Sequence, residues 1–288
     1  MERQTNRGMV LAFGGALVLS FDTLLLRMIS DSPLTIAFWR GTLMAATTSI
    51  LWAVLRATGR HAPPLPLGRF GLLASGLYGI SSVCFVTGAI MTSVANLLVI
   101  VATAPLWAAI ASSVLLREVT PLRTWIASVA AVAGIGVVVA PGLTAGFNVG
   151  DLIALLAALG MAGAFVVSRA TSVNLAFAPA LGGLGSAIGL FPFVEHFDFG
   201  RPSQIAIMVF EGGVLVPLGL GLIAAAPRYI PASQVSLFLL LETVLGPLWI
   251  WLGFGIEPTA HAMIGGLIVI TCLVANTVPN IVRRQKEK

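Results

Sequence analysis

Long stretches without charge are the feature that most limits how this chain can fold. From Phe70 to Leu116 the sequence runs for 47 residues without a charged side chain. A helix needs about 20 mainly apolar residues to cross the hydrocarbon core of a bilayer, so this stretch suits two crossings. Over the whole chain 9% of residues are charged, against about 25% in soluble domains. We therefore predict an integral membrane protein that is surrounded by the lipid bilayer.

The same length rule, applied along the chain, predicts an all-α fold with ten transmembrane helices. Their expected ranges are 8–29, 33–55, 68–90, 93–116, 121–141, 150–170, 175–194, 203–226, 230–252 and 259–281.

The basic residues orient this bundle. Of the 16 Lys and Arg residues, all except Arg27, Arg40 and Arg201 fall on the side that holds both termini. Positive residues favour the cytoplasmic side of a membrane. We therefore expect both termini in the cytoplasm and a location in the cytoplasmic (inner) membrane. The basic residues punctuate apolar runs and form no patch, so nucleic acid is not an expected partner.

Short segments of the two halves of the chain are similar in sequence. The segment Ile90–Asn96 can be laid on Arg228–Gln234 with a shift of 138 residues, and the same shift brings Glu118 to within one residue of Glu257. In addition, Leu26-Arg27 at the end of the first expected span resembles Ser168-Arg169 at the end of the sixth.

An odd number of helices in each half has a consequence for orientation. Five predicted spans fall in residues 1–142 and five in residues 143–288. The second half must then enter the membrane the opposite way up. Inverted repeats of this kind permit alternating access around a site between them, which predicts a transporter.

Short motifs along the predicted spans carry a resemblance to a known family. They are Phe38-Trp39-Arg40-Gly41, Ser93-Val-Ala-Asn-Leu97, Ala104-Pro105, Leu116-Arg-Glu118 and Leu241-Glu242. In order and spacing they resemble the drug/metabolite transporter superfamily, specifically its EamA-type members, and most of all the amino-acid exporters of the YddG type. The resemblance implies ten helices in two halves and the outward transport of amino acids.

One position departs from the pattern of that family. A proline often follows the glutamate of the ninth span there, whereas Thr243 follows Glu242 here and Pro247 comes one turn later. Pro105 and Pro247 each remove a helix hydrogen bond and free a carbonyl group. Broken helices are the usual pointer to a transporter site, although a harmless kink is the alternative.

Charged residues inside the spans are candidates for function because their burial in a membrane is costly. Asp22, Arg40 and Glu211 are expected at a similar depth, roughly 10–12 Å below the outer end of the bundle. A short loop joins the first two spans, so an ion pair between Asp22 and Arg40 is geometrically easy. The pair could be a structural clamp, or it could form part of an outer vestibule that meets a zwitterion.

Glu242 is expected near the middle of the membrane. Its carboxyl group could bind a substrate ammonium group or carry a coupling proton, or it could accept hydrogen bonds from backbone groups freed by the helix distortion. In the repeat register it falls on Ala104, so we expect an asymmetric site. Tyr78, Trp107 and Asn96 are expected near the middle of their spans as further cavity residues, with core or lipid packing as the alternative for Trp107.

Together these features predict a secondary transporter that exports small polar metabolites, above all amino acids, from a midplane cavity. A channel-like facilitator, and a multidrug or lipid translocator of the same fold, are the alternatives. The sequence has no phosphate-binding GxxxxGK[ST] loop and no cluster of catalytic or metal-binding residues, so we expect neither an enzyme nor a cofactor or metal. The oligomeric state is left open, with a monomer among the options.

Overall fold

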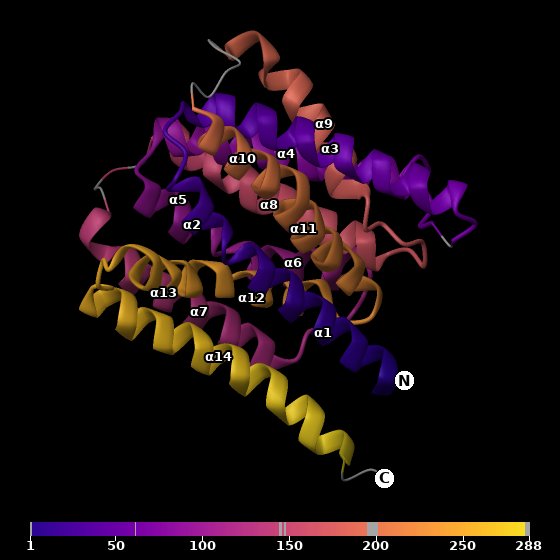
Figure 1. Ribbon diagram of the computed structural model, residues 1–288. Coiled ribbons are helices and arrows are strands. Elements are labelled where there is room, and N and C mark those ends of the chain that lie inside the picture. The colour runs from indigo at the N-terminus through magenta and orange to yellow at the C-terminus, as the bar shows by residue number, and fades with distance from the viewer. Residues whose placement is uncertain (1, 61, 144–145, 147, 195–200, 286–288) are drawn as a thin grey trace.

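The computed structural model describes residues 2–60, 62–143, 146, 148–194 and 201–285 (Figure 1). Within these residues all regular structure is helical and no strand is present. Eight helical segments of the described part are long and apolar enough to cross a membrane. The chain is therefore an all-helical protein that crosses the membrane several times.

The helices of the first half run from residue 2 to residue 142. They are α1 (Glu2–Leu19), α2 (Asp22–Leu26), α3 (Pro33–Ala57), α4 (Arg69–Met91), α5 (Val94–Val101), α6 (Ala104–Leu115), α7 (Leu122–Val139) and the 3₁₀ turn η1 (Ala140–Gly142).

The second half begins with α8. Its elements are α8 (Val149–Arg169), α9 (Ala178–Leu190), η2 (Phe191–Phe193), α10 (Pro202–Phe210), the π-helical turn η3 (Glu211–Leu215), α11 (Val216–Ala225), η4 (Ala226–Arg228), α12 (Ala232–Leu239), α13 (Leu241–Phe254) and α14 (Ala260–Gln285).

Eight of the ten expected spans overlap the eight membrane-length segments. The other two ranges, 33–55 and 175–194, overlap α3 and the pair α9–η2. The helix α3 is 25 residues long but is not among the eight, and Ala178–Phe193 is a shorter apolar helix. The number of ten spans therefore stays a prediction.

Local sequence explains where several helices begin and end. The side chain of Ser32 accepts a hydrogen bond from the backbone N–H of Thr35 at 3.1 Å, directly before Pro33 opens α3. Asn148 and Asp151 form a reciprocal capping box at the start of α8. Such caps pair the backbone N–H groups that the first turn of a helix leaves without partners.

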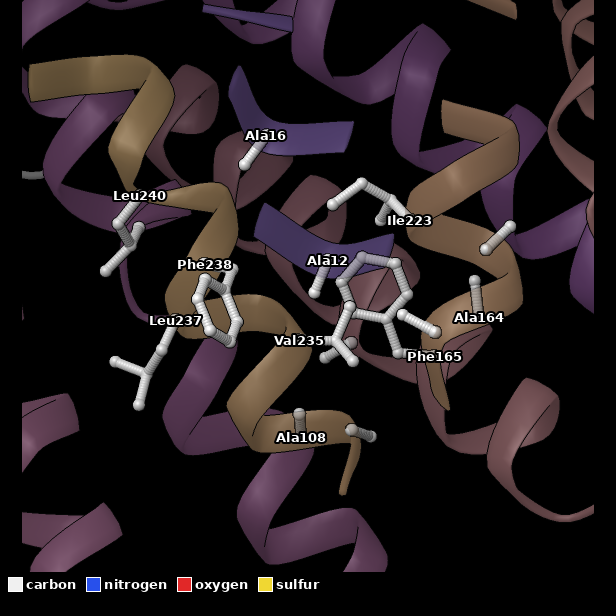
Figure 2. Packing of buried hydrophobic residues seen from close by; sticks show 14 of the residues in the cluster. Ala12, Ala16, Ala108, Ala164, Phe165, Ile223, Val235, Leu237, Phe238 and Leu240 are labelled. Atoms are coloured by element: carbon white, nitrogen blue, oxygen red, sulfur yellow. The ribbon is translucent and has the colours of Figure 1, made fainter. Parts of the chain in front are cut away.

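The largest core cluster joins elements of both halves (Figure 2). Ala12 on α1 and Ala108 on α6 meet Phe165 on α8, Ile223 on α11 and Val235 on α12. Alanine is its commonest member, and small residues let helices approach closely where lipid supplies no hydrophobic drive between them. On the outside of the bundle, large apolar side chains such as those of Val114 and Leu122 are exposed, as expected of a surface that faces lipid.

The contact between α4 and α9 depends on glycine. A Cβ atom on Gly182 would lie 2.9 Å from the backbone nitrogen of Gly79 and 2.9 Å from Cβ of Tyr78, closer than real Cβ contacts. By contrast, a Cβ atom on Gly185, one turn along the same helix, would meet nothing within 4 Å. The sequence indicates packing surfaces at both positions, and the structure places only Gly182 in such a contact.

We therefore predict different effects of alanine at these two glycines. Gly182→Ala should lower the free energy of unfolding by about 1–3 kcal/mol, the usual range for overpacking. Gly185→Ala should leave it unchanged or raise it slightly. The comparison is made by thermal unfolding of the two purified variants in the same detergent, and equal midpoints would contradict the close contact.

Candidate functional site

Two expected spans, one in each half of the chain, are interrupted at similar positions. The helix α5 ends at Val101 and α6 begins at Ala104, while α12 ends at Leu239 and α13 begins at Leu241. Leu240 lies 138 residues after Ala102, which is the shift predicted from the sequence for the two halves. The interruptions therefore occupy the same place in the repeat register, and α6 packs directly against α12.

The position of the second interruption differs from the sequence-based expectation. Pro105 lies in the first turn of α6, directly after the first break, as expected. Pro247, however, lies inside the continuous helix α13, and the break comes before Glu242 instead of after it. The expectation that Pro247 marks the interruption is wrong, because a helix can continue past a proline at the loss of one hydrogen bond.

Three acidic residues lie at irregular points of the backbone. Asp22 is the first residue of α2, after a turn at Ser20 and Phe21 that interrupts the first span. Glu211 begins the π-helical turn η3, and Glu242 is in the first turn of α13. The start of a helix carries partial positive charge, which favours a carboxylate there, and π-helical turns are frequent at functional sites.

Arg40 binds two of these acids. Its Nη2 atom lies 2.7 Å from Oδ2 of Asp22, and its Nε atom lies 3.3 Å from Oε1 of Glu211. Asp22 is 4% exposed and Glu211 is fully buried. The backbone approach at Gly212 makes this contact possible, since a Cβ atom there would lie 3.1 Å from Cα of Arg40.

Both acids keep oxygen atoms without a hydrogen-bond partner. These atoms are Oδ1 of Asp22 and both carboxyl oxygens of Glu211, because the contact of Glu211 with Arg40 lacks hydrogen-bond geometry. The ion pair expected between Asp22 and Arg40 is present, and Glu211 joins it. Whether the three residues form a clamp or a vestibule stays a prediction.

Glu242 belongs to the same electrostatic group. It interacts with Asp22 and with Arg40, while its own side chain is half-buried. The helix α2 contacts both η3 and α13, so it brings the first-half acid between the two second-half acids. The four charged candidates named from the sequence thus lie on elements that contact one another, although Glu242 forms no ion pair among the described residues.

The other expected cavity residues lie in different surroundings. Tyr78 is buried against Phe165, and its hydroxyl group lies near Ser168 without forming a hydrogen bond of ordinary geometry. Trp107 is partly buried and donates to the Thr103 hydroxyl group at 2.9 Å. Thr243 is half-buried beside Glu242. The roles of all three in a cavity stay predictions.

Asn96 lies at the start of its span and not near the middle. It is the third residue of α5, and its side-chain amide lies 3.4 Å from Oδ1 of Asp151. Thr92 donates to the same oxygen at 2.6 Å. The surroundings of Asn96 are therefore a capping network that joins the start of α8 to the α4–α5 turn.

An aromatic pair beside Asp22 was not expected from the sequence. Trp249 on α13 stacks on Phe21 with ring centroids 4.3 Å apart, and its indole N–H donates to the Ser20 hydroxyl group at 2.8 Å. A tryptophan near the end of a span usually lies in an interfacial belt, and Trp249 instead contacts the first span. Only knowledge of the break at Ser20 and Phe21 could have indicated this contact.

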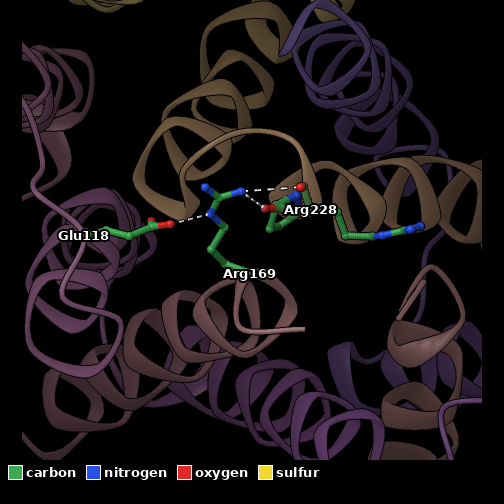
Figure 3. A network of polar contacts seen from close by, with 4 residues as sticks. Glu118, Arg169 and Arg228 are labelled. Carbon is green, nitrogen blue, oxygen red and sulfur yellow. Dashed lines mark hydrogen bonds and ion pairs between the residues drawn. The ribbon is translucent and has the colours of Figure 1, made fainter. Parts of the chain in front are cut away.

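A second polar network lies at the end of α8 (Figure 3). The Nε atom of Arg169 donates to Oε1 of Glu118 at 2.8 Å, and its Nη1 atom donates to the carbonyl oxygens of Pro227 and Arg228 at 3.2 and 3.4 Å. One guanidinium group thereby ties together the segment after α6, the end of α8 and the turn η4. It joins the two halves of the chain at one end of the bundle.

The Arg40 cluster yields a prediction about stability. Arg40→Ala leaves two buried carboxyl groups without their cation, and breaking a buried ion pair in this way typically costs about 3–5 kcal/mol. We expect a clearly lower unfolding midpoint in detergent than for Arg60→Ala, which removes an exposed arginine. If both variants unfolded at the same temperature, Arg40 would contribute nothing to the stability of the cluster.

Comparison with known proteins adds family information to this geometry. Among solved structures, one crystal structure of a protein matches with a TM-score of 0.76 and 18% identity, covering 96% of this chain and 98% of that chain. This likeness shows the fold. A search of curated proteins gives no match. The model of the EamA-like transporter family matches residues 6–140 and again residues 148–277. The chain therefore belongs to the EamA-like transporter family, a non-enzymatic family within the drug/metabolite transporter superfamily, and is a multi-pass membrane transporter.

Proposed function

We propose that this protein is a secondary transporter of the cytoplasmic membrane that exports small polar metabolites, amino acids among them, by alternating access. The observation that carries the proposal is the group of four ionisable residues at interrupted helices in a member of a transporter family. Ionisable groups inside a membrane bundle mark substrate or ion pathways. The substrate would bind at Glu242, at the Asp22–Arg40–Glu211 cluster and at backbone groups beside the breaks.

Several observations support ten spans arranged as two inverted five-helix repeats, residues 1–142 and 143–288. Each of the ten expected ranges overlaps helical structure, and the family model matches each half separately. Contacts between helices also follow the repeat. The helix α4 packs on α8, and α11, in the corresponding span of the second half, packs on α1. The corresponding pairs α3 and α9, α6 and α12, and α7 and α14 each pack on one another.

The two ends of the bundle differ in a way that supports alternating access. Arg169 and Glu118 form an ion pair at the proposed cytoplasmic end. Their counterparts in the repeat are Arg27 and Glu257, at the proposed outer end. Both counterparts are exposed, and among the described residues neither forms an ion pair. We infer that this conformation is closed at the cytoplasmic end, where Arg169 and Glu118 form an ion pair, and open at the outer end.

Transport by purified protein in liposomes tests the proposed function. Exchange of labelled amino acids across the liposome membrane should be saturable and should show counterflow, which a simple pore does not give. Glu242→Gln should lower the initial rate about tenfold or more, since a hydrogen bond to a charged group contributes about 1.5–3 kcal/mol. Asp31→Asn, which alters an acid in the loop before α3, is the matched control. An unchanged rate and pH dependence in Glu242→Gln would refute the role of Glu242.

Chemical cross-linking tests whether Arg27 and Glu257 approach each other when the outer end closes. With Cys84 and Cys272 replaced by serine, Arg27→Cys and Glu257→Cys should become bridgeable by a short bifunctional thiol reagent when the outer end closes during transport. The bridge should stop transport, and reduction should restore it, whereas either cysteine alone should have no such effect. Full transport by the bridged protein would exclude closure at this pair.

A further inference from the structure

The charges in the candidate site do not balance. Asp22, Glu211 and Glu242 are three carboxyl groups, and among the described residues the cation that acts on them is the guanidinium group of Arg40. Uncompensated charge in a low-dielectric interior is strongly unfavourable. Carboxyl groups in such a position either take up a proton or pair with a cation, so the site can receive an additional cation.

The guanidinium group of Arg40 already contacts two acids of the protein. Its Nη2 and Nε atoms already lie 2.7 and 3.3 Å from the carboxyl oxygens of Asp22 and Glu211. A substrate carboxylate that approached this guanidinium group would also approach two like charges. The arginine of this site therefore neutralises the protein's own acids, and their negative charges would repel a substrate carboxylate that approached the same guanidinium group.

The site also contains buried acceptors that lack donors. Oδ1 of Asp22 and both carboxyl oxygens of Glu211 accept no hydrogen bond of ordinary geometry, and both side chains are more than nine-tenths buried. Oε1 of Glu211 lies 3.3 Å from Nε of Arg40, and the carboxyl groups of Glu211 and Asp22 lie near each other. A buried acceptor without a donor costs about 1–3 kcal/mol, and more when it is charged. An ammonium group carries three N–H donors and one positive charge, so it would satisfy these oxygens and the excess negative charge together.

An aromatic surface lies next to these acids. Phe21 directly precedes Asp22, and Trp249 follows Glu242 by seven residues on α13, which places both residues on the same face of that helix, two turns apart. The two rings stack, and neither is fully buried. Aromatic faces attract ammonium groups and pack against apolar bodies, so the pair complements a ligand that has a cationic head and an apolar part.

We propose that Asp22, Glu211 and Glu242 bind the ammonium group of the substrate, that the Phe21–Trp249 pair packs against its apolar body, and that the substrate carboxylate is not recognised. This inference rests on the proposed transport function and narrows its substrate class. Amines that lack a carboxylate should be ligands as good as the corresponding amino acids, and acids that lack the amine should be poor ones.

Three matched probes test this selection on the purified full-length protein. Phenylalanine carries both groups, phenethylamine lacks the carboxylate, and 3-phenylpropionate lacks the amine. Binding is measured by isothermal titration in detergent. We expect phenethylamine to bind at least as tightly as phenylalanine and 3-phenylpropionate to bind at least tenfold more weakly. Equal binding of 3-phenylpropionate and phenethylamine, or no binding of phenethylamine, would overturn the proposal.

Substitutions of the acidic residues test whether these residues bind the ammonium group. Glu242→Gln should weaken the binding of phenethylamine at least tenfold, Glu242→Asp should retain most of it, and Asp31→Asn should match the unmodified protein. Unfolding midpoints show that each variant is folded. Phenethylamine binding that is unaffected by Glu242→Gln, Glu211→Gln and Asp22→Asn would place the amine elsewhere and overturn the assignment.

The transport assay separates failure of this inference from failure of the proposed function. If labelled amino acids are transported but phenethylamine does not compete with them, the protein is a transporter and the ammonium site is wrong. If phenethylamine binds as expected but neither it nor any amino acid is transported, the ammonium site stands and the transport function is wrong.

Discussion

Polar groups in this protein must find partners inside the protein, because lipid offers none. In the hydrocarbon core each unsatisfied backbone group costs several kcal/mol, which limits a spanning chain of this kind to helices. The same constraint explains why polar side chains such as those of Thr42, Thr47 and Ser168 donate back to carbonyl groups of their own helices. Where helices cross, as at Gly182, small residues allow the backbones to approach and van der Waals packing replaces the hydrophobic drive.

The functional candidates occur where this rule is relaxed. The breaks at Ser20–Phe21, Ala102–Thr103 and Leu240, and the π turn at Glu211, leave backbone groups without ordinary helical partners. Interrupted backbone at membrane depth is tolerated when protein or a water-filled cavity surrounds it. Three of the four interruptions carry an acid, and these three acids share one arginine. The charged side chains therefore lie at the places where the helices are interrupted.

The sequence predicts the structure well where a loop between two helices is short or where an apolar run is long. The apolar runs predict the helical membrane fold, and the short loop between the first two spans predicts the Asp22–Arg40 ion pair, which is present at 2.7 Å.

The sequence predicts the structure less well where the position of a side chain depends on an irregular backbone. Pro247 is a strong breaker signal, yet the break comes at Leu240, and the depth assigned to Glu242 did not reveal its interaction with Asp22. Trp249 reaches the first span only because that span turns at Ser20. Such contacts depend on tertiary packing that periodicity does not encode.

The asymmetry of the charges has a mechanistic consequence. The breaks at Ala102 and Leu240 correspond in the two halves, but Ala104 occupies the position that corresponds to Glu242. In the proposed alternating-access scheme, exchange of conformation between the halves would reverse the direction in which the proposed cavity opens, while the acids stay on α2, η3 and α13. In that scheme the near-symmetric scaffold supplies two states of similar energy, and the asymmetric charges keep one set of binding groups in both. A transporter needs both properties, because a substrate must meet the same chemistry whichever side of the membrane is open.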